Sequence, residues 1–359
     1  MGQDVALLAA MAAAVAAALA LTGCQPNLTD DVPPHGQAPG DDDTGDDDAG
    51  DDDTGDDDAG DDDAAGYPDF ITANDNFFEI HISAVPDIDP AAFVLSVGGL
   101  VDQPTEFTLA ELDLLPRSAV SQTLECIGNG AGGSAVSTAN WEGFSLWDLL
   151  LSLGVDEAAA AVRYEAADGY WASQTIDQVR DGGVIGAVTM NGDPIPPRHG
   201  YPLRFVFPGY YGVKNPGWVT SIEVVDEQTP DYWENVGWDC SPPMAVDSRF
   251  FFPANGNSFQ TGVPFDVGGA AWGGTRVDSI ELSPDDGGTW LPTEIVQGGE
   301  QDHVWVFWRT TVSLIGDGEV VLRVRATDSS GNVQPEVDND PFDGSNALAS
   351  RTIYLVPPS

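Results

Sequence analysis

Lysine, cysteine and positive charge are scarce in this chain of 359 residues. Lys214 is the only lysine, and 12 basic residues stand against 59 acidic ones, so the formal net charge is −47 at pH 7. A field of this sign repels nucleic acid and anionic membrane surfaces, and the composition excludes both as general partners. The 3 cysteines are too few for a disulfide framework. The sequence also has no Cys-x-x-Cys-His motif, so it carries no haem attachment of its own.

The first 24 residues have the composition of a bacterial export signal. Residues 5–21 consist of Ala, Leu, Val and Met, and Leu21-Thr22-Gly23-Cys24 has the small-residue pattern of a lipobox. The apolar run is too short and too rich in alanine for a membrane span. We predict that Cys24 is lipidated and anchors the protein to a bacterial membrane, in the periplasm or at the cell surface, and Gln25 favours the outer membrane. One feature does not fit, because no Lys or Arg precedes the apolar run.

Residues 25–66 are predicted to form an acidic tether. Triplets of aspartate repeat every five residues from Asp41 to Asp63 and supply 15 of the 59 acidic residues, which leaves 44 in the rest of the chain. Such a run cannot bury a core and repels itself, so we expect an extended, disordered segment. Two uses are open, a solvated spacer and the capture of Ca²⁺ by carboxylates. The ligand spacing of an EF-hand is absent, which favours the spacer.

About 290 residues follow the tether, enough for two domains with cores of their own. Residues 67–239 mix element types and predict an α+β domain with a mixed sheet. Thr108 and Ser145 have the spacing of helix N-caps, and Pro116 and Gly154 end the two short helices. Strands are expected at residues 93–97, 119–126, 162–166, 184–190, 203–207 and 218–225.

Residues 240–359 contain no convincing helix. Turn clusters such as Asp285-Asp286-Gly287-Gly288 separate short apolar runs. This spacing is typical of an immunoglobulin-like β-sandwich, and we expect the domain to support or dimerise rather than to carry chemistry. Its strands are expected at residues 263–267, 277–282, 290–295, 304–308, 320–324 and 351–355.

Cys126 ends an apolar run and opens a glycine-rich loop that contains Gly128 and Gly130. Three interpretations of this thiol are open: inert packing, a nucleophile and a metal ligand. A strand that delivers one thiolate into a glycine-rich loop suits a ligand for a soft, high-valent metal.

A second candidate site is a cluster of basic residues. Arg198, His199, Arg204 and Lys214 fall within 17 residues of a chain that has few bases. Arg204 is expected to enter a buried strand, where a guanidinium group needs an anion or a carboxylate. The partner is either an acidic side chain of the protein or a small anionic cofactor such as a phosphate monoester.

Several segments, in order from about Thr72 to the C-terminus, match one known family. The most specific runs from Met190 to Gly209 and contains Pro-Arg-His-Gly-Tyr-Pro-Leu-Arg. The chain resembles the sulfite oxidase family on the segments Thr123–Asn129, Trp141–Leu150, Met190–Gly209, Ala270–Gly274, Ser283–Trp290 and Arg325–Pro335. The resemblance implies a sulfite oxidase-type molybdopterin-binding domain over residues 67–239, followed by an immunoglobulin-like domain of the dimerisation type over residues 240–359.

The resemblance also implies a cofactor and its ligands. Molybdenum would be held by the dithiolene of one molybdopterin and by the thiolate of Cys126. His199 and Arg204 match positions that bind the pterin phosphate, and Gly212 and Lys214 lie in the matching turn. Thiolates do hold high-valent molybdenum, and cationic donors with turn amides do hold phosphates.

Further positions follow from the same resemblance. Asn76 and Phe77 are similar to the N-terminal pocket motif of the methionine sulfoxide reductase branch. Tyr232 is the candidate for the tyrosine that sulfite oxidases keep near the metal, and Trp238 is the alternative.

Departures from the family pattern bear on the substrate. Gly130 and Ala131 stand where many sulfite oxidases have two arginines, and Ile80 stands where a pocket arginine is found. A cationic pocket binds sulfite or nitrate, so both substrates are in doubt. The methionine sulfoxide reductase branch has an acidic residue where Gly128 stands, so the chain fits neither branch cleanly.

The sequence therefore predicts an exported oxidoreductase with a molybdenum–molybdopterin cofactor. It would perform oxygen-atom transfer or two-electron redox chemistry on a small, possibly sulfur-containing substrate. A separate carrier, either a c-type cytochrome or a membrane quinol system, would exchange the electrons, and a homodimer is possible. The alternative is a cofactor-free surface lipoprotein that uses the fold for binding or assembly. The lost arginines and the lack of a twin-arginine export signal favour that alternative.

Overall fold

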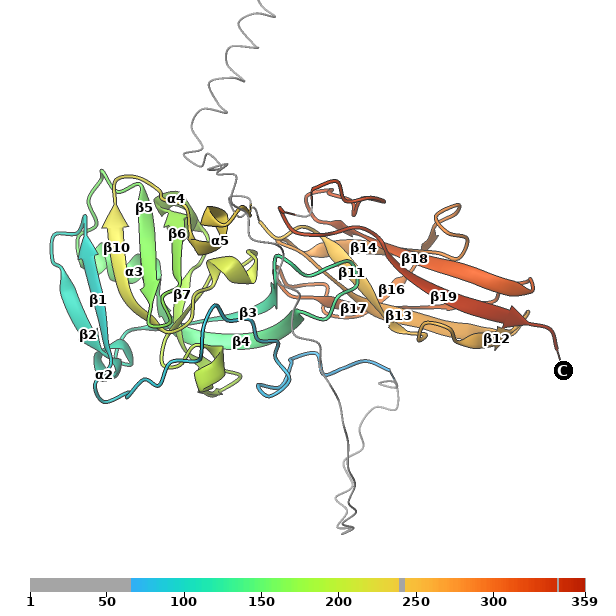
Figure 1. Cartoon of the computed structure of the whole chain (residues 1–359), viewed down its shortest axis with the longest axis horizontal. Helices are drawn as coiled ribbons and strands as arrows, with labels where there is room; N and C mark the ends of the chain where they lie inside the picture. The colour runs from blue at the N-terminus through green and yellow to red at the C-terminus, as the bar shows by residue number, and fades with distance from the viewer. Residues whose placement is uncertain (1–65, 239–242, 341, 359) are drawn as a thin grey trace, which may run out of the picture.

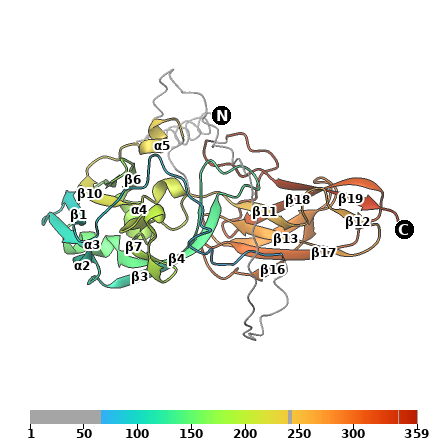
Figure 2. The ribbon, with the colours of Figure 1, turned by 60° about the horizontal axis from the view of Figure 1, so that its bottom comes forward.

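The computed structural model describes residues 66–238, 243–340 and 342–358, which form two β-rich domains. In both views the domains lie side by side along the long axis of the molecule (Figure 1, Figure 2). The lipobox with Cys24, the acidic tether and Cys240 lie outside the described residues. None of the described helices is long and apolar enough to cross a membrane.

The first domain contains two five-stranded sheets. One has the order β2-β1-β10-β5-β6, in which β1 and β10 are parallel and the other pairs antiparallel, as a mixed sheet requires. The other has the order β3-β4-β7-β8, and β9 also pairs with β7. The strands are β1 (Val94–Gly99), β2 (Thr105–Thr108), β3 (Arg117–Glu125), β4 (Val136–Ser145), β5 (Ala161–Ala166), β6 (Trp171–Thr175), β7 (Ile185–Met190), β8 (Asp193–Pro194), β9 (Arg204–Val206) and β10 (Val219–Val225).

Short helices connect these strands, and both predicted helices are confirmed. The Thr108 side chain accepts from the backbone of Glu111 in a capping box, and Ser145 accepts from Asp148. Residues Trp141–Ser145, the first half of the matching segment Trp141–Leu150, are the end of β4. The helices are α2 (Leu109–Leu112), α3 (Leu146–Ser152), α4 (Ile176–Asp181), α5 (Tyr232–Asn235), η1 (Pro197–His199) and η2 (Gly212–Lys214).

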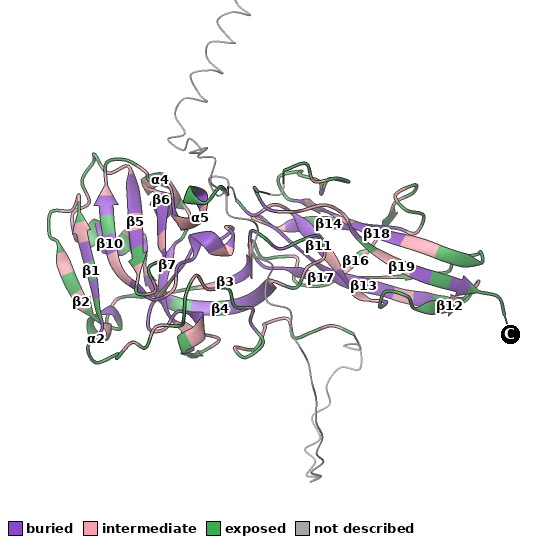
Figure 3. Ribbon diagram, viewed as in Figure 1, coloured by how far each residue is buried: buried purple, intermediate pink, exposed green. Residues whose placement is uncertain are grey.

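The second domain is a sandwich of two sheets, with no helix among its described residues. The sheet orders are β11-β13-β17-β16 and β12-β19-β18-β14-β15, and one apolar core fills the space between them. Buried residues run along the strands of both domains (Figure 3). The strands are β11 (Asp247–Phe252), β12 (Ser258–Gln260), β13 (Phe265–Trp272), β14 (Val277–Ser283), β15 (Leu291–Pro292), β16 (Glu294–Gln297), β17 (Val306–Val312), β18 (Gly318–Asp328) and β19 (Ala349–Val356).

The second domain holds the strand that precedes Cys126. The backbone N–H of Thr123 on β3 donates to the carbonyl of His303 at 2.8 Å, and the Thr123 hydroxyl accepts from the N–H of Trp305 at 2.7 Å. A buried apolar cluster that includes Ile127 and Trp272 spans the same junction. Because these contacts are buried, a shift of the second domain would displace the end of β3.

One carboxyl at this junction is buried without an ion pair among the described residues, and its removal should stabilise the protein. Asp247 Oδ1 accepts from Gln334 at 2.6 Å and from the N–H of Ser248 at 2.6 Å, while Oδ2 has no partner among the described residues. Burial, followed by the negative charge of Glu125, raises the pKa of Asp247 well above its ordinary value of 3.8. The folded state therefore holds a proton that the unfolded state releases above that value, so stability is lost as pH rises.

We expect Asp247→Asn to raise the unfolding free energy at pH 8 by about 1 kcal/mol or more, because the amide removes the ionisable group whose charged form burial penalises. The substitution should also reduce the fall in melting temperature between pH 5 and pH 8. Calorimetry of both proteins over this range checks the prediction, which fails if the two melting curves keep the same pH dependence.

Candidate active site

A cavity of about 170 Å³ lies in the first domain beside the loop that follows β3. The lining includes the Cys126 thiol, the basic groups His81, Arg198, His199 and Arg204, the acidic groups Glu79 and Asp168, the phenol of Tyr170, and large apolar side chains. The apolar residues are Phe77, Phe78, Ile80, Ile82, Ile127, Val213, Trp218, Trp233 and Trp238. The fold thus brings together residues that lie more than 150 positions apart in the sequence.

Backbone hydrogen bonds hold Cys126 at the start of the loop that follows β3. The backbone N–H of Cys126 donates to the carbonyl of Ala135 at 3.0 Å, and the carbonyl of Cys126 accepts from the N–H of Asn129 at 2.8 Å. Burial raises the pKa of the thiol above its ordinary value, although the N–H of Gly128 opposes the shift. Both a nucleophilic and a metal-ligating cysteine act as the thiolate. The environment of the free protein therefore favours the neutral thiol, and a metal ligand at this position would lose its proton when the metal binds.

A buried carboxylate ties this loop to the second domain. Glu125 Oε1 accepts from Asn129 Nδ2 at 2.9 Å, and Oε2 accepts from the indole Nε1 of Trp272 at 2.8 Å. Asn129 Oδ1 in turn accepts from the N–H of Ala135 at 3.0 Å. Burial raises the pKa of Glu125 to about 7. The residues on both sides of Cys126 are thus fixed by side chains, one of which comes from the second domain.

Arg204 faces the cavity without a carboxylate partner. It begins β9, and its Nη1 donates to the carbonyl of His199 at 3.0 Å. Its Nε is buried and finds no acceptor among the described residues, and its guanidinium lies 5.6 Å from the Trp141 ring. Burial lowers the pKa of Arg204 to about 10. No ion pair involving this side chain occurs in the described part of the chain, so the salt-bridge interpretation is wrong and an anionic ligand is favoured.

His199 is buried next to Arg204 and packs edge-on against Phe77, with ring centroids 5.5 Å apart. Its Nε2 donates to the carbonyl of Asn74 at 2.7 Å, because a carbonyl can only accept. Burial lowers the pKa of His199 below its ordinary value, which favours the neutral ring. Its Nδ1 would donate to an anion only after the ring takes up a second proton, which the negative charge of a phosphate favours.

Two glycines allow the basic residues to approach the opposite wall. A Cβ on Gly200, whose φ is 109°, would lie 2.8 Å from the Cα of Gly217. Any side chain at either position would therefore force apart η1, which carries Arg198 and His199, and the segment that leads into β10.

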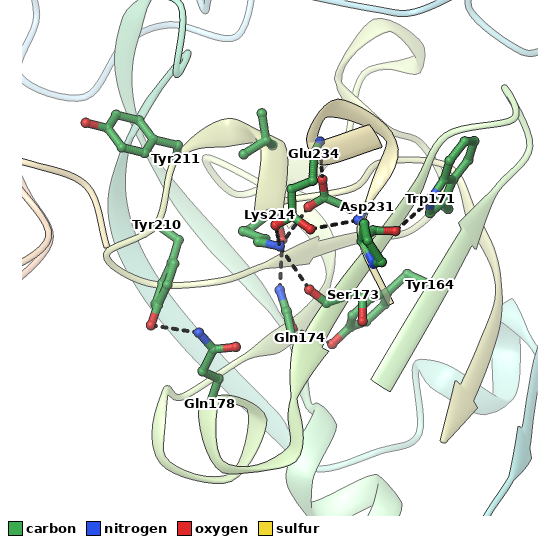
Figure 4. Close-up of polar contacts among 12 residues, drawn as sticks. Tyr164, Trp171, Ser173, Gln174, Gln178, Tyr210, Tyr211, Lys214, Asp231 and Glu234 are labelled. Carbon is green, nitrogen blue, oxygen red and sulfur yellow. Dashed lines mark hydrogen bonds and ion pairs between the residues drawn. The ribbon is translucent and has the colours of Figure 1, made fainter. Parts of the chain in front are cut away.

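Lys214 has a different role from the one that the resemblance implied. Its Nζ donates to Asp231 at 2.7 Å, to Glu234 at 2.8 Å and to the carbonyl of Ser173 at 3.1 Å, as Figure 4 shows. These contacts use all three N–H donors of the ammonium group. Lys214 does not line the cavity, although Gly212 does. The prediction that its side chain anchors a cofactor is therefore corrected: Lys214 fixes α5 to the sheet.

Tyr232 and Asn76 also lie away from the cavity. Tyr232 is on α5 and packs against the rings of Trp171 and Trp233, at centroid distances of 5.1 and 5.2 Å. Its alternative, Trp238, lines the cavity and would lie 3.2 Å from a Cβ placed on Gly128. Asn76 is exposed and outside the lining, whereas Phe77 is buried within it. Neither side chain thus lines the cavity, and the catalytic role of Tyr232 and the binding role of Asn76 stay predictions.

His81 is a lining residue that the sequence did not reveal. Its Nε2 lies 2.8 Å from the carbonyl oxygen of Arg198, and its ring packs edge-on against Trp218 at 5.1 Å. Trp218 itself has a φ of 55°, a backbone conformation that a bulky residue rarely adopts. No spacing pattern marks either residue, because their partners come from distant segments.

The second guanidinium of the lining, Arg198, is neutralised. It pairs with Asp75 at 2.7 Å and with Glu79 at 3.1 Å. Among the described residues, Arg204 is therefore the one arginine of the cavity whose charge no carboxylate balances.

The donor set around Cys126 fits a metal that carries its own ligands. No group of three or more His, Cys, Asp or Glu residues that could hold a metal ion occurs among the described residues. A metal at Cys126 would thus need further ligands from a cofactor. An anionic group on that cofactor would satisfy the buried Nε of Arg204. The residues present fit a metal-dithiolene cofactor with a phosphate.

Comparison with known families places both parts of the chain. The model of the oxidoreductase molybdopterin binding domain matches residues 82–233, and that of the Mo-co oxidoreductase dimerisation domain matches residues 243–342.

Individual relatives agree with these matches. The chain is 30% identical over 317 residues to mitochondrial sulfite oxidase of Rattus norvegicus, which covers 74% of this chain and 58% of that protein. It is 26% identical over 327 residues to sulfite oxidase of Arabidopsis thaliana, which covers 74% of this chain and 83% of that protein. The chain thus spans less than two thirds of the length of its mammalian relatives.

A solved structure shares the fold. The crystal structure of the sulfane dehydrogenase SoxCD from Paracoccus pantotrophus superimposes with a TM-score of 0.71 at 23% identity, over 79% of this chain and 80% of that one.

Proposed function

The chain belongs to the sulfite oxidase family of molybdopterin-dependent oxidoreductases, and on this premise we propose that the Cys126 cavity binds a molybdenum–molybdopterin cofactor. The bound protein would perform oxygen-atom transfer or two-electron redox chemistry on a small substrate. One observation carries this proposal: a lone thiol and a buried arginine without a carboxylate partner face the same cavity.

The proposal assigns a role to the main residues of the cavity. Cys126 would ligate the metal, and Arg204 would bind the phosphate with His199 beside it. Gly212 leaves its backbone open to the ligand, because it has no side chain. When bound, the cofactor supplies a centre that transfers an oxygen atom or two electrons. The aromatic residues Trp233 and Trp238 would limit the access of water to that centre.

For the substrate, we propose a small neutral compound that contains sulfur, such as a sulfoxide. Arg198 is balanced by Asp75 and Glu79, and Arg204 would be used by the cofactor, so little positive charge is left for an oxyanion. A dianion such as sulfite would enter a site without cationic compensation. We therefore expect kcat/KM for a neutral sulfoxide, with a reduced dye as electron donor, to exceed that for sulfite with a dye acceptor by about tenfold or more. Higher efficiency with sulfite would contradict this choice.

The cellular location of the enzyme, its electron carrier and its oligomeric state are also proposals. The lipobox pattern at Cys24 supports export and a lipid anchor in the periplasm or at the cell surface. The lack of a Cys-x-x-Cys-His motif supports a separate electron carrier, a c-type cytochrome or a quinol system. The match of residues 243–342 to a dimerisation domain supports a homodimer.

The molybdenum content of the native protein tests the proposal directly. We expect nearly one metal atom per chain by elemental mass spectrometry of protein extracted from its own host. Protein without molybdenum would contradict the proposed function and leave a cofactor-free lipoprotein built on the same fold.

Arg204→Gln separates cofactor binding from stability. The variant should bind the pterin about 100-fold more weakly, since two charge-assisted hydrogen bonds are worth about 3 kcal/mol. The cofactor-free protein should become no less stable, because an unpaired buried charge is removed. Pterin fluorescence after acid release and the melting temperature of the free protein are the two measurements. Arg198→Gln is the control and should retain the pterin. Equal pterin content in both variants would exclude Arg204 as the phosphate ligand.

A further inference from the structure

Two arginines of the second domain lie together at the edge strand β11. Arg249 is on β11, and its guanidinium lies 5.1 Å from the ring of Phe251. Arg351 is on β19, and its Nη2 donates to the carbonyl of Phe250 at 3.1 Å. Both guanidinium groups therefore flank the same short stretch of β11, which has a sheet neighbour only on the β13 side.

Neither arginine forms an ion pair with an acidic side chain of the described residues. The Nε of each is buried and finds no acceptor in the part of the chain that the structure describes. Apart from Arg204 in the cavity, every other arginine there, and the lysine, forms an ion pair with an acidic side chain. Burial lowers the pKa of both groups; for Arg249 the positive charge of Arg351 adds to the shift, and the negative charge of the buried Asp247 opposes it. Two adjacent arginines that lack an ion pair in so acidic a chain indicate a site for carboxylates or another anion.

The described chain begins next to this pair. Gly66 lies against the ring of Phe252, since a Cβ there would be 2.7 Å from it, and the ring of Tyr67 packs on those of Phe251 and Phe252 at 6.0 and 5.1 Å. The last acidic triplet, Asp61–Asp63, comes three to five residues before Gly66. An extended chain spans about 3.3–3.6 Å per residue, so these aspartates reach about 10–18 Å from Gly66.

Arg249 is within that distance. It precedes Phe251, against which Tyr67 packs, by two residues on the same strand, which corresponds to about 7 Å. The carboxylates and the guanidinium groups thus have opposite charge, suitable fork geometry and a connecting chain of sufficient length.

We propose that the carboxylates of Asp61–Asp63 dock on the Arg249–Arg351 pair. The contact fixes the place where the acidic tether leaves the second domain, and the four upstream triplets remain free to act as the spacer. The proposal is independent of the cofactor and of the proposed function, since neither arginine lines the Cys126 cavity.

Proteolysis of the full chain with an endoproteinase that cleaves at aspartate tests the docking. The triplet Asp51–Asp53 is preceded by the same five residues, Asp-Asp-Asp-Ala-Gly, and serves as an internal control. At low salt we expect cleavage at Asp61–Asp63 to be about fivefold slower than at Asp51–Asp53, the protection that about 1 kcal/mol of ion pairing gives. In Arg249→Gln/Arg351→Gln this protection should disappear, and in Arg276→Gln, which removes a charge from an exposed ion pair of the same domain, it should persist.

A second set of variants keeps the test valid if the double glutamine variant is unstable. Asp61→Asn/Asp62→Asn/Asp63→Asn should lower the melting temperature of the full chain, whereas the same change at residues 51–53 should not. Equal cleavage at both triplets in the wild type would overturn the proposal. A second result would also overturn it. If millimolar inorganic phosphate raises the melting temperature of the wild type as much as that of the Asn variant, the arginines bind a free anion instead. Loss of a dimer in the double glutamine variant, with the tether still protected, would assign them to a second copy of the chain.

Discussion

Replacing Cys126 with serine is expected to yield a folded protein that has lost its molybdenum and its redox activity. A serine hydroxyl stays protonated at neutral pH and is a hard donor, so it cannot substitute for a thiolate on a soft, high-valent metal. Even outer-shell changes reduce metal affinity or activity by about 10–100-fold, so removal of the ligand should reduce both by at least about 100-fold. Metal content, turnover with an artificial electron donor and the visible absorption spectrum measure the effect.

The fold should tolerate this change. Serine keeps the backbone hydrogen bonds of residue 126 to Ala135 and Asn129, and the thiol itself makes no ion pair in the described chain. We therefore expect a melting temperature of the cofactor-free variant close to that of cofactor-free wild type. Cys240→Ser is the matched control and should retain molybdenum. A Cys126→Ser protein that keeps its metal would show that the thiol is a packing residue.

Replacing Lys214 with methionine is expected to destabilise the protein by about 3–5 kcal/mol, the usual effect of removing one partner from a buried ion pair. Asp231 and Glu234 are both buried, and methionine would leave their two carboxylates without the ammonium group that now contacts both. Burial already raises the pKa of Asp231, a shift that the charge of Lys214 opposes. Removal of the lysine should therefore raise this pKa further and make the variant relatively more stable as pH falls.

Denaturant unfolding of the cofactor-free protein at pH 7.5 and pH 5 measures this effect. Lys214→Met/Asp231→Asn should recover part of the loss, because one of the two stranded charges is gone. Arg180→Met breaks exposed, solvent-screened ion pairs with Asp177 and Asp181 and should cost far less. A loss of that small size in Lys214→Met would mean that the buried cluster contributes no more than a surface pair.

The sequence predicted the parts of the site that lie within continuous motifs. The Cys126 loop and the segment from Met190 to Gly209 each carry their signal in neighbouring residues, and the structure brings Cys126, His199 and Arg204 to one cavity. The two predicted helix starts rest on local capping patterns and are confirmed, because a cap needs only three or four residues.

What the sequence could not predict depends on distant partners. His81 contacts the backbone of Arg198, which is 117 residues away, and no local pattern encodes that contact. Lys214 was assigned to an anion because its own segment contains no acid. Its true partners follow 17 and 20 residues later, where Asp231 and Glu234 have the spacing of a capping box, a signal that was available and not used.

The first half of β4 was also difficult to recognise. Its residues Val136–Ala139 are all buried and include Ser137 and Thr138, so this half lacks the alternation of a half-buried strand. The helix α4 was missed although Thr175 and Gln178 form a capping box at its start, which is a second local signal that was available and not used.

Because the ammonium group of Lys214 is buried, the folded protein should react very slowly with amine-specific reagents. As the chain has no second lysine, amine-reactive dyes, cross-linkers and acetylating enzymes find no side-chain target while α5 is in place. Modification of this single position becomes possible only when α5 detaches from the sheet. The rate at which a dye attaches to residue 214 is therefore a built-in, site-specific reporter of opening at the edge of the cavity, and it needs no engineered label.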